Sequence, residues 1–288
     1  TGLFNSYIYQ FHMAAFFFIS GYVTQRGKRN TLKTLWDRFY TLILPYLTVF
    51  LLMLFLEGVF SRLGLYEYFF SKDFGYIGFG KSITQLFLYG NCYVWWLGAA
   101  WFVLELFAIE LLHSVLAAVS GENKIIYLTL IGIVYCIGYY CIQQNYFMRI
   151  GFVNYDLAFI GLGFYGIGFL AHEADLPHKL TNTLSKKCFF CVLSISILYF
   201  FANIVPTMVD YPSRTFNHLI VDLVMGLNGC FLTFLAARAI EKIKYIRELF
   251  TCLGRNTLGI AFFHFQFFKV VFFLFYFFDM IPFAEVSN

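Results

Sequence analysis

Long apolar runs of roughly 20 residues alternate along the chain with short polar or basic segments. Each run is long enough to cross a hydrocarbon layer about 30 Å thick, and the runs are continuously apolar, which indicates helices. The pattern therefore predicts an all-α fold, a polytopic transmembrane helix bundle with eight spans. Their approximate ranges are 4–23, 37–57, 93–116, 124–142, 154–172, 188–205, 216–238 and 256–278.

One further apolar piece, Ile83 to Leu88, is too short to cross a membrane. We expect an interfacial or re-entrant segment near residues 82–90. Because no internal repeat divides the chain, we interpret residues 1–288 as a single integral-membrane domain.

Composition supports this interpretation. The chain is 60% hydrophobic and 12% charged, with a mean hydropathy of +0.72, whereas soluble domains are about 25% charged. Membrane lipids are therefore expected partners and nucleic acid is not. The seven cysteines lie mostly inside apolar runs, as small buried hydrophobic residues do, and we expect no metal site.

The basic residues are distributed unevenly between the predicted loops. Fourteen lie in the segments 24–38, 117–124, 172–187 and 238–255, five lie on the other side, and Lys269 lies within the last span. Because cytoplasmic loops carry an excess of lysine and arginine, these four segments are predicted to face the cytoplasm.

Titratable side chains at bilayer depth are costly, so each is a candidate functional residue. The deepest are His12, Glu105, Glu110, His264 and Lys269, while Asp156, His218 and Asp222 lie closer to the outer surface.

Two interpretations remain open for the histidines. His12 and His264 either act in proton transfer or hydrogen-bond neighbouring helices. Glu105 requires a cation or a proton at its depth, and Lys269 is one candidate partner. His218 and Asp222 are four residues apart, which allows the carboxylate to orient the imidazole or a solvated structural pair to form.

A basic segment follows the first span. Its five cations either set the orientation of the chain or hold the phosphates of a polyanionic ligand. They are Arg26, Lys28, Arg29, Lys33 and Arg38.

The glycine-rich stretch Gly161-Leu-Gly163-Phe-Tyr-Gly166 has the spacing of a dinucleotide-binding motif. It lies in the middle of an apolar span, where small residues let helices approach closely. We therefore interpret it as a packing motif.

Several segments together resemble the membrane acyltransferase 3 family of bacterial O-acyltransferases. The resemblance rests on Phe11-His12-Met13 leading into Phe17 to Tyr22, on Arg38 to Tyr46, on Trp101 to Phe107, on Asn154 to Asp156 with Phe164 to Gly168, and on Leu253 to His264.

The resemblance implies a multi-pass enzyme of the bacterial inner (cytoplasmic) membrane. Such an enzyme takes an acyl group, usually acetyl, from cytoplasmic acetyl-CoA and places it on a hydroxyl of an extracytoplasmic glycan or cell-surface polysaccharide. Arg38 would contact the CoA, with Arg29 and Lys33 as weaker helpers. His12, His264 and Glu105 would be supporting catalytic groups.

This sequence departs from the family pattern at two places. An earlier helix that carries the principal catalytic histidine is expected upstream of Thr1, and Met13-Ala14 stands where the family usually has Met-Pro. The alternative function is a transporter or flippase for a glycan or lipid-linked intermediate, in which the buried His, Glu and Lys would form a proton relay. A membrane scaffold without chemistry is the third hypothesis.

Overall fold

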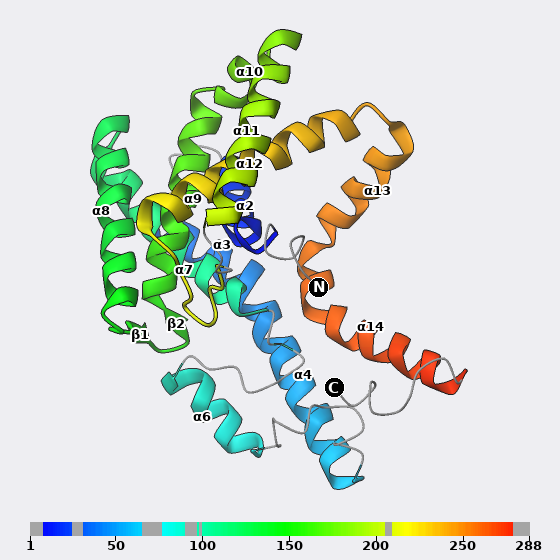
Figure 1. Cartoon of the computed structure of the whole chain (residues 1–288). Helices are drawn as coiled ribbons and strands as arrows, with labels where there is room; N and C mark the ends of the chain where they lie inside the picture. The colour runs from blue at the N-terminus through cyan, green and yellow to red at the C-terminus, as the bar shows by residue number, and fades with distance from the viewer. Residues whose placement is uncertain are drawn as a thin grey trace. The chain divides into compact units, whose positions relative to one another are not determined.

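The computed structural model describes residues 8–24, 31–64, 77–89, 97, 100–204 and 209–278. The chain, drawn as a ribbon in Figure 1, forms two compact units. Unit 1 comprises Thr1–Leu35, Ala108–Met148 and Tyr155–Glu248, and unit 2 comprises Trp36–Phe107, Arg149–Asn154 and Leu249–Asn288.

The all-α prediction is confirmed, with one short β-hairpin added. The hairpin pairs β1 (Arg149–Ile150) with β2 (Val153–Asn154) in antiparallel fashion. The helices are α2 (His12–Tyr22), α3 (Thr31–Arg38), the π-helix η1 (Phe39–Ile43), α4 (Leu44–Arg62), α6 (Phe79–Tyr89), α7 (Trp101–Ser120), α8 (Lys124–Gln143), α9 (Tyr155–Glu173), α10 (Leu176–Leu180), α11 (Leu184–Ile204), α12 (Leu219–Ile240), α13 (Lys244–Arg255) and α14 (Thr257–Phe277).

Within the described ranges, five helical stretches are long and apolar enough to cross a membrane: Lys33–Arg62, Trp101–Ser120, Lys124–Gln143, Leu219–Ile240 and Thr257–Phe277. The chain is therefore a multi-pass membrane protein, while eight crossings stay a prediction. Helices α2, α9 and α11 occupy the other three predicted ranges. The short apolar piece near 82–90 belongs to α6, an 11-residue helix, and its depth in the membrane stays a prediction.

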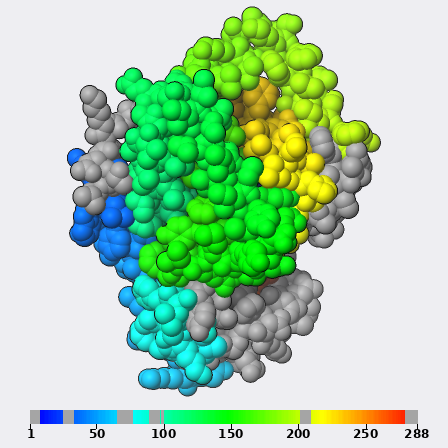
Figure 2. Space-filling view, turned by 90° about the vertical axis from the view of Figure 1, so that its left-hand side faces the viewer, coloured from blue at the N-terminus to red at the C-terminus, as the bar shows by residue number. Residues whose placement is uncertain are grey.

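In unit 1, α9 packs against α2 on one side and α8 on the other. Thirteen of its 19 residues are buried, which explains why its sequence is apolar all round. The outer face of α8, turned toward the viewer in Figure 2, is apolar and suits contact with lipid chains. It exposes Ile125, Leu128, Ile133, Ile137 and Tyr140.

Glycines determine how closely these helices approach. A Cβ atom added at Gly168 would lie 2.1 Å from the carbonyl oxygen of Phe18, and one at Gly21 would lie 1.9 Å from that of Tyr165. On the other face of α9, a Cβ at Gly163 would lie 2.5 Å from the ring of Tyr135 in α8. The interpretation of the glycine-rich stretch as a packing motif is therefore confirmed.

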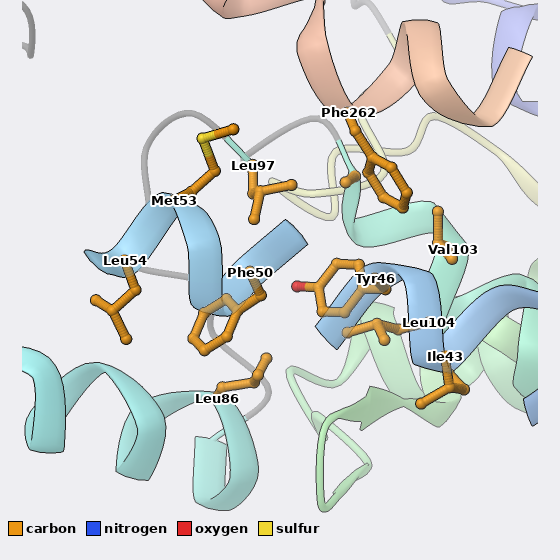
Figure 3. Close-up of a cluster of buried hydrophobic side chains, with 11 residues drawn as sticks. Ile43, Tyr46, Phe50, Met53, Leu54, Leu86, Leu97, Val103, Leu104 and Phe262 are labelled. Atoms are coloured by element: carbon orange, nitrogen blue, oxygen red, sulfur yellow. The ribbon is translucent and has the colours of Figure 1, made fainter. Parts of the chain in front are cut away.

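The core of unit 2 is built on one face of α4, where buried residues recur at positions 46, 50, 53, 54 and 57. Figure 3 shows side chains of α4, α6, α7 and α14 converging on this face. Tyr46, Leu54 and Leu86 are completely buried there. This packing places the carboxyl-terminal half of the span Lys33–Arg62 against the start of α7.

The glycine contacts generate a stability prediction. Gly168→Ala forces apart two backbones that touch, and we expect it to lower the free energy of unfolding in detergent by about 3 kcal/mol. The matched control is Gly132→Ala in α8, where an added Cβ meets nothing within 4 Å. The control should change stability by less than about 0.5 kcal/mol. Equal effects of the two variants would contradict the packing account.

Candidate functional site

His12 lies in the first turn of α2 and is half-buried. Its Nδ1 is 3.2 Å from the carbonyl oxygen of Ile8. Because a carbonyl only accepts hydrogen bonds, Nδ1 of the neutral ring carries the proton and Nε2 holds the lone pair. The ring of Tyr9 packs edge-on against the imidazole of His12, with the two ring centroids 4.9 Å apart, and restricts the orientation of the imidazole. Nε2 is thus the nitrogen that can accept a proton from a reacting group.

The loop of residues 209–218 supplies the charged neighbour of His12. Asp210 lies close enough to interact with His12 electrostatically, and its backbone pairs with Thr215 through two 2.9 Å hydrogen bonds. Its carboxylate also accepts a hydrogen bond from Ser213. A carboxylate near an imidazole stabilises the protonated ring, so Asp210 offsets part of the cost of protonating this half-buried histidine.

Aromatic packing anchors the same loop to α2. Tyr211 is buried, with its ring centroid 5.9 Å from that of Phe17 and 5.1 Å from that of Phe216. Burial raises the pKa of Tyr211 well above its ordinary value of 10.0. Its hydroxyl therefore stays protonated at physiological pH and does not supply a phenolate.

An ion pair that the sequence did not reveal holds the loop on α9. Nε of Arg214 is 2.6 Å from Oδ2 of Asp156, and its Nη2 is 3.4 Å from Oδ1. The side chain of Asp156 is completely buried and that of Arg214 is 10% exposed. The guanidinium also lies 4.6 Å from the ring centroid of Phe147. The two partners are 58 residues apart, and no local pattern connects them.

Asp222 fixes the end of the loop. Its carboxylate accepts hydrogen bonds from the backbone nitrogen of Asn217 at 2.8 Å and from Nδ2 at 3.0 Å. The four-residue spacing to His218 had suggested a carboxylate that orients an imidazole or a solvated pair. Asp222 is only 5% exposed, so the solvated pair is wrong. The two hydrogen bonds instead hold Asn217 at the start of α12.

A second polar group in unit 1 includes His113, which sequence analysis did not single out. Its Nδ1 is 2.7 Å from the hydroxyl of Tyr127, and both residues are buried. The rings of Phe169 and Tyr165 lie 4.8 and 5.1 Å away, and the Tyr165 hydroxyl is 2.8 Å from Oγ1 of Thr24. These contacts join α7, α8 and α9 to the end of α2.

Glu105 and His264 belong to unit 2, so they do not share a unit with His12. Oε1 of Glu105 accepts hydrogen bonds from Asn154, from the backbone nitrogen at 3.1 Å and from Nδ2 at 2.8 Å. Glu105 is 1% exposed, and these two donors stabilise its carboxylate. Its pairing with Lys269, which is also buried, stays a prediction.

His264 repeats the geometry of His12. Its Nδ1 lies 3.2 Å from the carbonyl oxygen of Ile260 and 3.0 Å from that of Ala261. Nε2 of the neutral ring is therefore again the acceptor. The ring packs on Phe265, with centroids 4.3 Å apart.

Two of the predicted ligand-binding cations, Lys33 and Arg38, belong to α3. Arg38 is the last residue of α3 and directly precedes the π-helix η1, and its side chain is half-buried. The side chain of Lys33 is exposed. Single-turn π-helices are frequent at functional sites because they widen the helix. Arg29, Arg26 and Lys28 lie outside the described residues.

The buried ion pair generates a second stability prediction. Asp156→Asn leaves Arg214 without its counter-charge, and we expect a loss of about 3 kcal/mol of unfolding free energy in detergent. The control is Glu241→Gln, because Glu241 and Arg238 form an ion pair at 3.9 Å in which the side chains are 61% and 42% exposed. Breaking that exposed pair should cost less than about 1 kcal/mol. A loss from Asp156→Asn no larger than the control's would contradict the role assigned to the pair.

Comparison with known proteins identifies the family. Comparison with curated proteins and with solved structures gave no match. A family model described as an acyltransferase domain, that of the acyltransferase 3 family, matches residues 1–287. Since the match covers nearly the whole sequence and agrees with the motifs around His12, Arg38 and His264, the chain belongs to the acyltransferase 3 family.

Proposed function

We propose that this chain transfers an acetyl group from cytoplasmic acetyl-CoA to a hydroxyl of an extracytoplasmic glycan in the bacterial inner membrane. The observation that carries the proposal is the match of an acyltransferase domain to residues 1–287. The helices that are long and apolar enough to span a membrane support transfer from one side to the other. The same match favours acyl transfer over the transporter hypothesis.

The reaction requires a nucleophile, a base and a leaving group. The glycan hydroxyl attacks the thioester carbonyl, the base removes the hydroxyl proton, and the C–S bond breaks to release CoA as the second product. General bases in such steps contribute about 10²- to 10⁴-fold in rate. In this proposal Nε2 of His12 takes part in proton transfer as a supporting group, with Asp210 stabilising the imidazolium electrostatically. His264 and Glu105 are proposed as supporting groups in unit 2.

The donor site is proposed at Arg38. A guanidinium binds phosphate through two parallel hydrogen bonds, and such bonds are stronger where water is partly excluded. Arg38 is half-buried at the start of the apolar stretch that continues to Arg62. Lys33, five residues before Arg38, and Arg29, nine residues before it, are proposed to assist Arg38 in binding the phosphates.

Acetyl-CoA binding tests this proposal. The purified full chain in neutral detergent should bind acetyl-CoA saturably, and Arg38→Gln should weaken binding at least tenfold because charge-assisted phosphate contacts are lost. Arg62→Gln is the matched control, since Arg62 is an exposed arginine in the last turn of the same helical stretch. It should bind acetyl-CoA like the unmodified chain.

Two results would overturn the proposed donor site. One is a folded Arg38→Gln variant that keeps full affinity. The other is a folded unmodified chain that shows no saturable binding. Elution volume and helical circular dichroism establish that each variant is folded before its affinity is compared.

A further inference from the structure

Helix α13 is amphipathic, with its apolar and its charged residues on opposite faces. The apolar face carries five large side chains: Tyr245, Ile246, Leu249, Phe250 and Leu253. The opposite face carries three basic residues and one acidic residue: Lys244, Arg247, Arg255 and Glu248. Within this helix, all of which the structure describes, no residue is buried.

Two candidate membrane spans confine α13 to a membrane surface. The span Leu219–Ile240 ends four residues before α13 begins, and the span Thr257–Phe277 starts two residues after α13 ends. A segment between two successive spans begins and ends on the same side of the membrane. Both ends of this 12-residue helix, which is about 18 Å long, are therefore tied to one membrane surface.

The apolar face of α13 fits the boundary between lipid headgroups and acyl chains. Tyr245, Leu249 and Phe250 are 82%, 57% and 54% exposed, so much apolar area is left for a partner to cover. An amphipathic helix held at a membrane surface lies in the plane of that surface, with its apolar side chains toward the lipid chains. The bilayer is the partner that the two flanking spans bring to this face.

The charge of the opposite face indicates which lipids suit α13. Basic residues outnumber acidic ones there by three to one. Lysine and arginine at a membrane surface attract anionic lipids, and their long side chains reach phosphates while their aliphatic parts stay near the apolar region. The charge bias of the loops predicts that the segment 238–255 faces the cytoplasm.

We propose that α13 is an interfacial helix of the predicted cytoplasmic membrane surface and that Lys244 and Arg255 bind the headgroups of anionic phospholipids. Its apolar face lies among the outermost carbons of the acyl chains, and its basic side chains contact the lipid phosphates. This inference rests on α12 and α14 as membrane spans and does not depend on the proposed acyl transfer.

Fluorescence quenching tests the orientation of α13 in the full chain, reconstituted in phosphatidylcholine vesicles. A bimane fluorophore is attached at Leu249→Cys on the apolar face or at Thr251→Cys on the opposite face. The background keeps the buried Cys141 and Cys230 and has serine in place of the other cysteines. Quenching by lipids brominated on the acyl chains should be at least about threefold stronger at 249 than at 251. Quenching by iodide, present on both sides of the membrane, should show the reverse order.

The preference for anionic lipid is tested with the same fluorophore at position 249. At equal mole fraction, brominated phosphatidylglycerol should quench it at least about twofold more than brominated phosphatidylcholine, because the basic face enriches anionic lipid around α13. The double variant Lys244→Gln and Arg255→Gln should abolish this difference. The matched control removes two exposed lysines from another segment predicted to face the same side, Lys179→Gln and Lys186→Gln, and should retain the difference.

Three results would overturn the proposal. Equal quenching by iodide at 249 and 251 would place the apolar face in water. Protection of position 249 from both iodide and brominated lipid would show that protein, from this chain or from a second copy, covers the face. A preference for phosphatidylglycerol that is absent, or that the double variant and its control affect equally, would exclude the assigned headgroup contacts. Helical circular dichroism establishes that each variant is folded, and Leu253→Cys replaces Leu249→Cys on the same face if the latter does not fold.

Discussion

The contact between the backbones of α2 and α9 is the constraint on which the candidate site of unit 1 depends. Gly21 and Gly168 leave no room for a side chain between the two helices. Membrane helices gain little from excluding water, and close van der Waals packing through small residues is a main source of their association. This contact fixes α2, and therefore fixes His12 at its start.

Two buried carboxylates, those of Asp156 and Glu105, connect segments that lie far apart in the sequence, and a third, that of Asp222, holds a residue five positions away. Asp156 forms an ion pair with Arg214 of the loop 209–218. Glu105 accepts hydrogen bonds from both nitrogens of Asn154, and Asp222 accepts one from the backbone nitrogen of Asn217. A buried carboxylate without donors is costly, so each of these contacts restricts the backbone that supplies the donor. The structural role of Asp156 and Asp222 differs from the role proposed for His12 and His264, in which Nε2 of the neutral ring carries the lone pair.

Much of the fold follows from local sequence patterns. Hydropathy located the helices because a span needs a continuous apolar run, and the spacing of Gly161, Gly163 and Gly166 indicated close helix packing. The family was also apparent from short segments such as Phe11 to Tyr22. These features depend on residues close together in the chain, which a single sequence displays directly.

The partners of the buried polar groups did not follow from the sequence. Arg214 is one of the five basic residues predicted to lie on the outer side, and nothing in the sequence connected it with its partner Asp156, 58 residues earlier. His113 was overlooked because its hydrogen bond to Tyr127 forms only when α7 and α8 pack. The local spacing of His218 and Asp222 did not reveal that the carboxylate of Asp222 accepts its hydrogen bonds from Asn217. Tertiary structure decides such pairs.

We propose above all that an acetyl group passes from acetyl-CoA on the predicted cytoplasmic side of the membrane to a glycan on the opposite side. The most direct measurement supplies acetyl-CoA labelled in its acetyl group to sealed membrane vesicles of each orientation that contain the chain and its native glycan. The account predicts labelled glycan only when the donor is on the predicted cytoplasmic side, with at least tenfold less label for His12→Gln. Labelling that is independent of the donor's side, or no more label than vesicles without the protein, would contradict it.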